Sequence, residues 1–193
     1  AVRNMPEKLY SIDFLKLMPP TIFTKSIDEI EKFKKKYKNI VIKPTHGYGG
    51  KNIFFVNKNT SKKKISKYLK KHDHIMAQKF IPQIKFGDKR IFIIGGDIKG
   101  AIKRVPKKGS IVSNLGQGGK AVKTILTKKE LRIAKIVASS LKRNNIVFAG
   151  IDLISDYLTG DINITSPTGL KNFKDLTGKN LAIDFWNYLE KNK

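Results

Sequence analysis

The sequence predicts one α+β domain, and three observations support this class. The chain has 193 residues, of which 40% are hydrophobic, enough apolar material for one substantial core or two small ones. Short β-branched segments that meet at glycine-containing turns predict antiparallel hairpins, and amphipathic segments between them predict helices. Because the order of these segments contains no run of β-α-β units, we expect helices packed on antiparallel sheets.

The predicted strands are rich in Val, Ile and Phe and end at Gly, Pro, Asn or Asp. They comprise residues 39–44, 52–57, 74–81, 88–95, 98–105, 146–155 and 161–165. The glycine-rich segment 47–50 predicts the tip of a first hairpin, and the turn at 95–97 predicts a second. The last two strands are expected to be joined by a short turn that ends at Gly160.

Helices are predicted where apolar residues recur at helical spacing behind a capping residue. Ser26 with Glu29, and Thr127 with Glu130, have the spacing of capping boxes. The predicted helices begin at residue 26, span 61–72, run from 127 to about 143, and span 179–191. Residues 106–120 form a long polar loop, and loops of this length are usually functional or disordered.

Composition limits the classes of protein to which this chain can belong. It contains no cysteine, which excludes disulfides and thiolate sites and fits a reducing, cytoplasmic compartment. No apolar run approaches the roughly 20 residues of a membrane span, so we expect a soluble protein without a membrane partner. The chain begins at Ala1 without an initiator methionine, which is compatible with a piece of a longer protein.

The formal net charge of +25 is typical of proteins that bind nucleic acids or anionic membranes. Only five of the 40 basic residues are arginine, although proteins that read bases and phosphates rely heavily on arginine. We therefore interpret lysine runs such as 34–36 and 62–64 as solvated helix faces. A basic module that binds nucleic acid remains the alternative from a different class, and a positive field would also attract ATP and acidic substrates.

Two neighbouring predicted strands carry polar side chains that need an explanation. Asp152 lies inside the apolar segment 147–154, where an unpaired carboxylate would be costly. Asp161 and Asn163 have the spacing of two that places side chains on one face of a strand. Three hard oxygen ligands on adjacent strands suit Mg²⁺. The alternative is that Asp152 pairs with a lysine and Asp161 is a turn residue.

A glycine-rich tip and a nearby lysine suggest anion binding. In the segment Gly47-Tyr-Gly49-Gly50, backbone N–H groups can close over phosphates, or the segment is an ordinary hairpin turn. It is not a P-loop, because the Gly-Lys-Ser/Thr ending and the following helix are missing. Lys43 ends an apolar strand, either as a surface lysine or as a phosphate contact.

Arg90 and Arg104 are two of the few arginines, and both lie at predicted strand ends beside loops. Arginine binds a carboxylate or an acyl-phosphate through two parallel hydrogen bonds, so a substrate role competes with the alternative of plain surface charge. His72 and His74 are interpreted as structural, because the histidines lack metal-ligand spacing. No serine or histidine lies in a nucleophile-elbow pattern, so hydrolysis by a triad is not expected.

Taken in order, these segments resemble the ATP-grasp fold, and more closely the C-terminal domain of bacterial glutathione synthetase. The matching stretches are residues 39–50, 76–82, 87–90, 104–106, 114–119, 150–154 and 161–168. The resemblance implies one ATP-grasp domain over residues 1–193, with two lobes of mainly antiparallel sheet covered by helices and ATP between them. A smaller lid lobe would span about 20–80, and a larger catalytic lobe would span about 1–19 and 81–193.

The resemblance also implies roles for individual residues. For ATP it implies Lys8, Lys43, Gly47, Gly49, Gly50, Gln78, Lys79, Phe80, Ile81 and Asp88; residues 78–81 would hold adenine through backbone groups and Asp88 would face the ribose. For the metal it implies Asp152, Asp161 and Asn163, with Asp161 where the family usually has Glu. For the peptide substrate and the reacting carboxylate it implies Arg90, Arg104, Asn114, Ser166 and Thr168, the two arginines being catalytic.

The implied reaction joins γ-glutamylcysteine and glycine to form glutathione. ATP would phosphorylate the cysteinyl carboxylate with Mg²⁺ or Mn²⁺ present, glycine would attack the acyl-phosphate, and ADP and phosphate would leave. Another ATP-grasp peptide or amino-acid ligase is the alternative within the fold. The family's N-terminal substrate domain is expected to be absent, so low turnover is expected of this chain alone, and a homo-oligomer is expected of the full-length protein.

Overall fold

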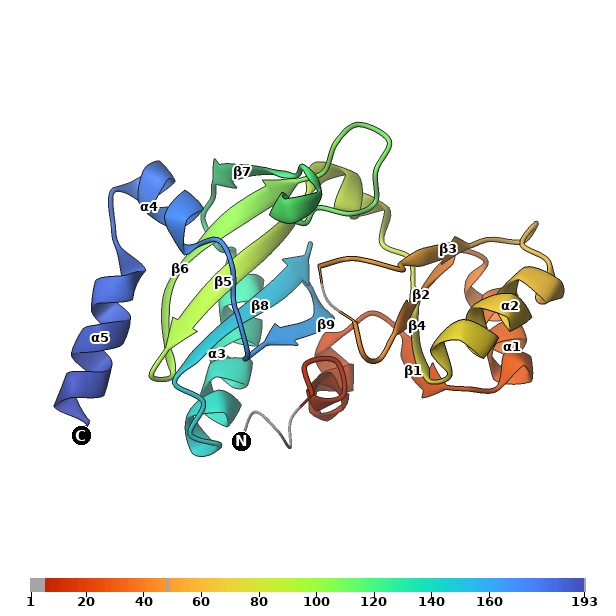
Figure 1. Cartoon of the computed structure of the whole chain (residues 1–193), viewed down its shortest axis with the longest axis horizontal. Coiled ribbons are helices and arrows are strands. Elements are labelled where there is room, and N and C mark those ends of the chain that lie inside the picture. Colours follow the sequence, from red (N-terminus) through yellow and green to blue (C-terminus); the bar gives the residue numbers. More distant parts are fainter. Residues whose placement is uncertain (1–5, 48, 193) are drawn as a thin grey trace.

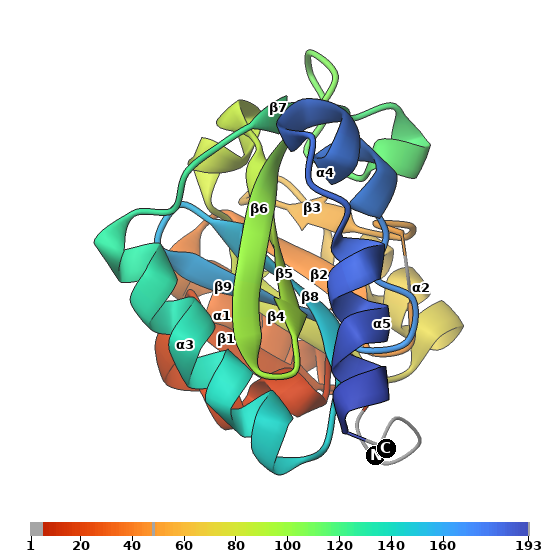
Figure 2. The same cartoon turned by 90° about the vertical axis from the view of Figure 1, so that its left-hand side faces the viewer.

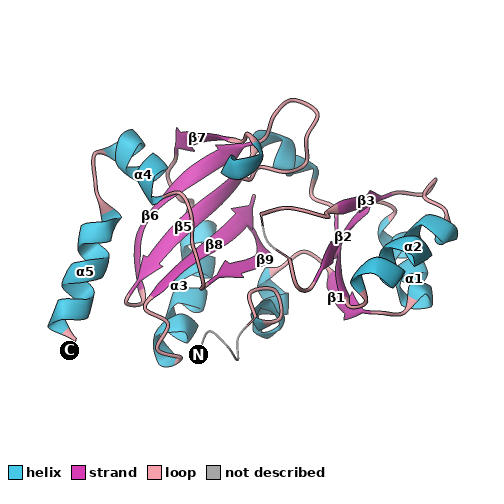
Figure 3. Cartoon of the chain, viewed as in Figure 1, coloured by secondary structure: helices cyan, strands magenta, loops and turns pink. Residues whose placement is uncertain are grey.

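Two antiparallel sheets with covering helices make up the fold (Figure 1). The structure is a computed structural model that describes residues 6–47 and 49–192. Every strand pair in this described part of the chain is antiparallel, and helices cover the sheets as Figure 3 shows. The predicted α+β class is therefore confirmed. No helix within 6–47 or 49–192 has the length and apolar composition needed to cross a membrane.

The smaller sheet has four strands and one helical layer. Its strands, in spatial order, are β1 (Thr21–Thr24), β4 (Ile75–Lys79), β2 (Ile40–Pro44) and β3 (Phe54–Val56). The two helices α1 (Ile27–Tyr37) and α2 (Lys62–His72) bury their apolar residues against it. Ile42 and Ala77 from the sheet, and Ile30 and Ile65 from the helices, are fully buried in this core. Burial of these side chains fixes the helices on the sheet.

The larger sheet has five strands and helices on both faces (Figure 2). Its strands, in spatial order, are β7 (Lys120–Lys123), β6 (Asp97–Val105), β5 (Asp88–Ile94), β8 (Phe148–Ile154) and β9 (Tyr157–Asn163). One face packs against α3 (Lys128–Arg143) and the 3-10 helix η2 (Tyr10–Leu17), and the other packs against α4 (Leu170–Thr177) and α5 (Leu181–Lys191). Two further 3-10 helices are η3 (Pro82–Phe86) and η4 (Leu115–Gln117).

Strand β5 explains how the two faces share one sheet. Ile91 and Ile93 belong to the core beneath α3, whereas Phe92 and Ile94 belong to the core beneath α4 and α5. This alternation follows from the two-residue period of a strand. It also places Asp88 and Arg90 on the same face as Phe92, at the end of β5 that the helices leave open for the site described below.

The last hairpin differs from the sequence-based prediction. Strand β9 begins at Tyr157 and ends at Asn163, so the strand predicted over 161–165 starts four residues too late and extends too far. The chain turns at Ser155, which has a φ of 54°. Gly160 was interpreted as a turn residue, but it lies inside β9 at a register shift. There Ile151 faces Ile162 and Leu153 faces Leu158, so residues 159–161 together oppose Asp152.

The two predicted capping boxes differ in completeness. At α3 the box is complete, because Glu130 N donates to Thr127 Oγ1 (3.1 Å) and Thr127 N donates to Glu130 Oε2 (2.7 Å). At α1 only one half forms: Glu29 N donates to Ser26 Oγ at 3.4 Å. Ser26 N donates instead to Thr24 Oγ1 at 2.8 Å, because the Thr24 hydroxyl binds the Glu29 carboxylate. A neighbouring hydroxyl therefore replaces the second half of the box.

The sequence-based prediction also omitted six short elements. These are η2, β1, η3, η4, β7 and α4. Strands β1 and β7 have four residues each and pair on one side only, so they carry too few alternating positions to be recognised from sequence. The predicted loop 106–120 contains η4 and ends at the first residue of β7.

Gly87, directly before β5, is a position where we expect a substitution to destabilise the fold. Its φ is +100°, and a Cβ there would lie 2.5 Å from the backbone oxygen of Arg104. We expect Gly87→Ala to lower the free energy of unfolding by about 3 kcal/mol, because backbone strain adds to a clash with the main chain. Gly109 is the matched control, with φ +81° and nothing within 4 Å, and Gly109→Ala should cost only about 1 kcal/mol. Chemical denaturation followed by circular dichroism compares the two; equal losses would contradict the steric explanation.

Candidate active site

A cavity of about 980 Å³ lies between the two sheets and collects the residues predicted from sequence. Every predicted site residue lines it: Lys8, Lys43, Gly47, Gly49, Gly50, Gln78, Lys79, Phe80, Ile81, Asp88, Arg90, Arg104, Asn114, Asp152, Asp161, Asn163, Ser166 and Thr168. The roles of these residues stay predictions. The apolar part of the wall includes Val41, Ile84 and Ile154, which the sequence did not single out.

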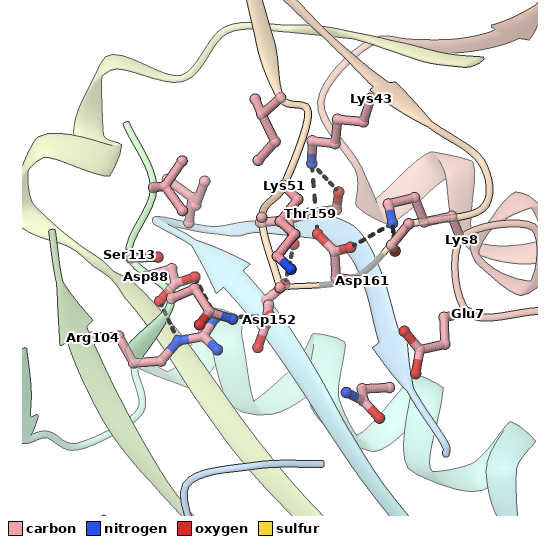
Figure 4. A pocket seen from close by; sticks show the side chains of 18 of the residues that line it. Glu7, Lys8, Lys43, Lys51, Asp88, Arg104, Ser113, Asp152, Thr159 and Asp161 are labelled. Atoms are coloured by element: carbon pink, nitrogen blue, oxygen red, sulfur yellow. Dashed lines mark hydrogen bonds and ion pairs between the residues drawn. The ribbon is translucent and has the colours of Figure 1, made fainter. Parts of the chain in front are cut away.

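Two lysines converge on one carboxylate at the rim of this cavity (Figure 4). Lys43, at the end of β2, lies 3.6 Å from one Asp161 oxygen and donates to the Thr159 carbonyl oxygen at 3.2 Å. Lys8 lies 3.6 Å from the other Asp161 oxygen. Both lysines are buried, with 6% of each residue exposed, so Lys43 is not the surface lysine of the alternative interpretation. Two ammonium groups beside one carboxylate leave a net positive charge on this side of the cavity.

Four charged side chains lie side by side at the open end of the larger sheet because of the strand register. Asp88 on β5 is directly opposite Arg104 on β6. Arg90 on β5 is directly opposite Asp152 on β8. Side chains at opposed positions point to the same face, so all four meet on one surface of the sheet. The register therefore brings together residues that are far apart in sequence.

These four side chains form a continuous ion-pair cluster. Arg104 Nε and Nη2 donate to the two Asp88 oxygens at 2.8 and 2.5 Å, and Arg104 Nη2 also lies 2.7 Å from Asp152 Oδ2. Arg90 donates to both Asp152 oxygens, through Nη2 at 2.8 Å and through Nε. A Cβ on Gly150 would lie 2.9 Å from Arg90 Cδ, so the glycine leaves room for this arginine. Asp152 is thus paired with two arginines, and not with a lysine as the alternative interpretation had it.

Burial and pairing act in opposite directions on the acids of this cluster. Burial would raise the pKa of Asp152, but the charges of Arg104 and Arg90 and their hydrogen bonds outweigh it and lower that pKa to about 2. At Asp88, burial raises the pKa, and the charge of Arg104 opposes the rise. Asp152 is therefore ionised at neutral pH and is the carboxylate that both guanidiniums share.

The residues predicted to bind the peptide substrate lie around this cluster. Arg90 Nη1 donates to the Thr168 carbonyl oxygen at 3.3 Å. Asn163 and Ser166 bind one another: Ser166 N donates to Asn163 Oδ1 at 2.9 Å, and Asn163 Nδ2 donates to the Ser166 carbonyl oxygen at 3.3 Å. Asn114 caps η4 by accepting from Gly116 N at 2.8 Å. Local hydrogen bonds hold these loop positions in place beside the arginines.

The predicted adenine hinge, residues 78–81, comprises the last two residues of β4 and the two that follow, and it lines the cavity. Its backbone already makes contacts within the chain. Lys79 N donates to the Pro20 carbonyl oxygen at 2.9 Å, and Phe80 N donates to that of Asn39 at 3.0 Å. These two N–H groups therefore hold the hinge in place within the chain. The predicted contact with adenine would need other backbone groups of residues 78–81.

The glycine-rich tip is tied to the larger sheet at two points. Lys8 Nζ donates to the Gly47 carbonyl oxygen at 2.5 Å. Gln117 Nε2, from the loop after β6, donates to the Gly49 carbonyl oxygen. A Cβ on Gly50 would lie 2.6 Å from Val112 Cγ1, which shows how closely the tip approaches that loop. Tyr48, the remaining residue of the tip, lies outside the described residues.

Gln117, Ser113 and Thr159 contribute to the site and were missed by sequence reasoning. Ser113 is buried beside Asp88, and Thr159 presents its carbonyl oxygen to Lys43 while its hydroxyl donates to the Asp152 carbonyl oxygen at 3.1 Å. The sequence indicated only that residues 106–120 form a long loop. Contacts through a backbone oxygen carry no side-chain signal, so Thr159 was not detectable.

Within the part of the chain that the structure describes, no three His, Cys, Asp or Glu side chains group in a way that would hold a metal ion. Asp152 and Asp161 are the two carboxylates of the predicted metal set, and Asn163 would have to supply the third oxygen. Protein ligands this few are typical of Mg²⁺, which keeps waters and shares substrate phosphates.

Comparison with known families gives the context for this cavity. The family described as "Prokaryotic glutathione synthetase, ATP-grasp domain" matches residues 7–178 of the chain. The chain belongs to this family. The resemblance found from the sequence motifs is thereby confirmed, and the match covers both sheets of the ATP-grasp domain.

Relatives named "Glutathione synthetase" match the ATP-grasp domain along its whole length. That of Bradyrhizobium diazoefficiens is 38% identical over 196 residues, which cover 100% of this chain and 62% of the relative. That of Rhodopseudomonas palustris is 38% identical over 193 residues, which cover 98% of this chain and 61% of the relative. The chain thus spans about three fifths of the length of these proteins.

Solved structures confirm the fold. The ATP-grasp ligase PsnB, complexed with the precursor peptide PsnA2 and AMPPNP, has a TM-score of 0.67 at 12% identity, covering 92% of this chain and 55% of that one. The D-alanyl-alanine synthetase A of Vibrio cholerae has a TM-score of 0.61 at 14% identity, covering 83% of this chain and 56% of that one. The predicted ATP-grasp fold is therefore correct.

Proposed function

We propose that this ATP-grasp domain carries out the ATP-dependent ligation of γ-glutamylcysteine and glycine to glutathione. The observation that carries the proposal is one cavity in which cations from both sheets converge: Lys8, Lys43, Arg90 and Arg104. Relatives named glutathione synthetase, matched over the whole chain, support the choice of substrates. The separation into two lysines at the rim and two arginines on the larger sheet fits a triphosphate and a second, carboxylate-bearing substrate.

The nucleotide would lie between the sheets, with its phosphates at the two lysines. Lys43 reaches from β2 of the smaller sheet toward β9 of the larger one, so it would bind phosphate while connecting both. Residues 78–81 and the apolar Val41 and Ile84 would hold the base. In this proposal residues of about 20–80 form a lid lobe and the remainder a catalytic lobe, and the glycine tip closes over the phosphates.

Mg²⁺ or Mn²⁺ would be held by Asp152, Asp161 and Asn163. The donor chemistry fits, because two carboxylates and an amide oxygen from β8 and β9 line the same cavity and the pKa of Asp152 lies at about 2. When bound, the metal offsets negative charge on the transferring phosphoryl group. In the structure these donors are held by Arg90, Arg104, Lys8, Lys43 and Ser166, so the chain itself keeps their oxygen atoms at the cavity wall.

The chemistry of the chain's own residues then follows from their positions. Lys8 and Lys43 would neutralise the phosphates as the carboxylate of the dipeptide attacks the γ-phosphorus, which releases ADP and forms an acyl-phosphate. Arg90 and Arg104 would bind the carboxylate oxygen that becomes an oxyanion when the amine of glycine attacks. Phosphate leaves as the amide bond forms. The tip held by Lys8 and Gln117 would exclude water that hydrolyses the intermediate.

The proposal is tested by incubating the chain with Mg·ATP, γ-glutamylcysteine and glycine, and by measuring phosphate release and glutathione. We expect phosphate release to depend on the dipeptide and glutathione to appear only when glycine is also present. The reaction is repeated with the remaining segment of the Bradyrhizobium diazoefficiens relative supplied as a separate polypeptide. Absence of ADP binding together with absence of product in both reactions would refute the proposed function.

A further inference from the structure

We propose that Asp88 is a positioning residue that fixes the Arg104 guanidinium for binding the carboxylate of the dipeptide substrate, and that Ser113 connects this pair to the loop after β6. The inference rests on the proposed function, because that function assigns Arg104 to binding of the dipeptide carboxylate. It adds a role for Asp88 that is separate from contact with the nucleotide. Figure 4 shows Asp88 between Ser113 and Arg104.

The geometry of the Asp88–Arg104 pair is that of a built support. The two residues are directly opposite each other on β5 and β6, so the sheet sets their separation before any ligand binds. Arg104 Nε and Nη2 each bind a different Asp88 oxygen, at 2.8 and 2.5 Å. Such a two-point contact fixes the plane of the guanidinium as well as its position. Both residues are buried, with 6% of Asp88 and 3% of Arg104 exposed.

The Asp88 carboxylate is occupied by groups of this chain. Beside the two bonds from Arg104, the buried side chain of Ser113 lies next to this carboxylate and opposes the rise in the pKa of Asp88. Ser113 immediately precedes Asn114, the residue that caps η4. In this proposal, Ser113 would carry a movement of the loop to Asp88, and Asp88 would carry it to Arg104. The loop and the arginine would reach their binding positions together.

Arg104 needs this support because of its long side chain. An arginine that is free to rotate loses side-chain entropy when it binds a carboxylate, and this weakens binding. Arg104 is held from two sides, by Asp88 and by Asp152, whose Oδ2 lies 2.7 Å from Nη2. Asp152 is shared with Arg90, so Asp88 is the carboxylate of the cluster that binds Arg104 without binding the second arginine.

The test uses two variants with matched controls. Asp88→Asn removes the charge of the support, and Asp97→Asn makes the same change at the other end of the β5–β6 hairpin, where Asp97 is exposed and pairs with Lys99. Ser113→Ala removes the loop contact and is the milder variant if Asp88→Asn folds poorly. Ser110→Ala is its control, because the Ser110 hydroxyl bonds only to backbone groups of Val112 in the same loop.

Two measurements are made on each folded variant. Calorimetry gives the Kd of Mg·AMPPNP, and then the Kd of γ-glutamylcysteine with Mg·AMPPNP present. NMR of the arginine Nε–Hε groups reports on Arg104 without any ligand; the chain has only five arginines, so its signal is assignable by Arg104→Lys. We expect a slowly exchanging Arg104 signal in the wild-type chain and in both controls. It should exchange much faster in Asp88→Asn and moderately faster in Ser113→Ala.

We expect the dipeptide Kd to rise at least ~10-fold in Asp88→Asn and ~3-fold in Ser113→Ala, and in both variants by a larger factor than the nucleotide Kd. The proposal is overturned if both variants leave the dipeptide Kd and the Arg104 signal unchanged. It is also overturned if Asp88→Asn raises only the Kd of the nucleotide. If the wild-type chain binds no dipeptide, alone or with the remaining segment of the Bradyrhizobium diazoefficiens relative supplied, the proposed substrate is wrong, whereas the Arg104 signal still decides whether Asp88 and Ser113 hold this arginine.

Discussion

Asp152→Asn should reduce turnover by about 10³-fold or more and should also destabilise the fold. Asp152 accepts hydrogen bonds from Arg90 and lies within 2.7 Å of Arg104, so the substitution removes the carboxylate that pairs with the buried Arg90 and leaves Arg104 with Asp88. Removing one partner of a buried ion pair costs about 3–5 kcal/mol. Loss of a proposed metal ligand and disorder of two proposed catalytic arginines both lower the rate. Steady-state kinetics and urea denaturation measure the two effects.

The same substitution should change how stability depends on pH. The pKa of Asp152 is lowered from 3.8 to about 2 in the folded chain, so its ionised form stabilises the fold above pH 4, and this contribution is lost as the pH falls from about 4 through 2. In Asp152→Asn this part of the acid transition should disappear. Asp156→Asn is the control, because Asp156 lies in the turn of the same hairpin and pairs with Lys129 at the surface, 3.4 Å away. Equal stability of the two variants would contradict a structural role for the Asp152 charge.

Lys43→Met should raise the Kd of ATP by about 10–100-fold. A charge-assisted hydrogen bond to phosphate contributes about 1.5–3 kcal/mol, and Lys43 is a buried ammonium that already points across the cavity to Thr159 and Asp161. Methionine preserves most of the apolar stem, so packing against the smaller sheet should change little. Calorimetry with Mg·AMPPNP gives the affinity, and thermal denaturation checks the fold.

Lys70→Met is the control for this prediction, because Lys70 is an exposed residue of α2 on the far side of the smaller sheet's core. It removes the same charge from the chain without touching the cavity. If both variants weakened ATP binding equally, the general positive field, and not a contact from Lys43, would account for the affinity. If neither weakened it, the phosphates would lie elsewhere.

The sequence was sufficient to predict the class, most elements and many of the residues around the cavity. Alternating or β-branched segments identified β2, β5, β6 and β8, because these strands are long enough to show a pattern or are buried on both faces. The order of the motifs predicted the ATP-grasp fold. The edge strands β1 and β7 were missed because of their length. The start of β9 was missed because Gly160 looks like a turn residue in sequence but lies inside the strand in the structure.

The partners of the charged residues were not predictable from sequence. Asp152 was expected to bind a metal or to pair with a lysine, and the structure pairs it with Arg90 and Arg104. This pairing depends on the register of β5 with β8 and of β6 with β5, which local patterns do not determine. The contact of Gln117 with the glycine tip likewise joins residues 68 positions apart through a backbone oxygen.

The opposed positions of the four charges also have a consequence for folding. If β5 slipped by one residue against β8, Arg90 would face away from Asp152, and the slip would bury guanidiniums and carboxylates apart from one another. Misalignment would therefore cost more free energy in this sheet than in an all-apolar sheet, in which neighbouring isoleucines tolerate a shift more readily. The cluster that is proposed to bind substrate thus also selects a single alignment of the strands as the chain folds.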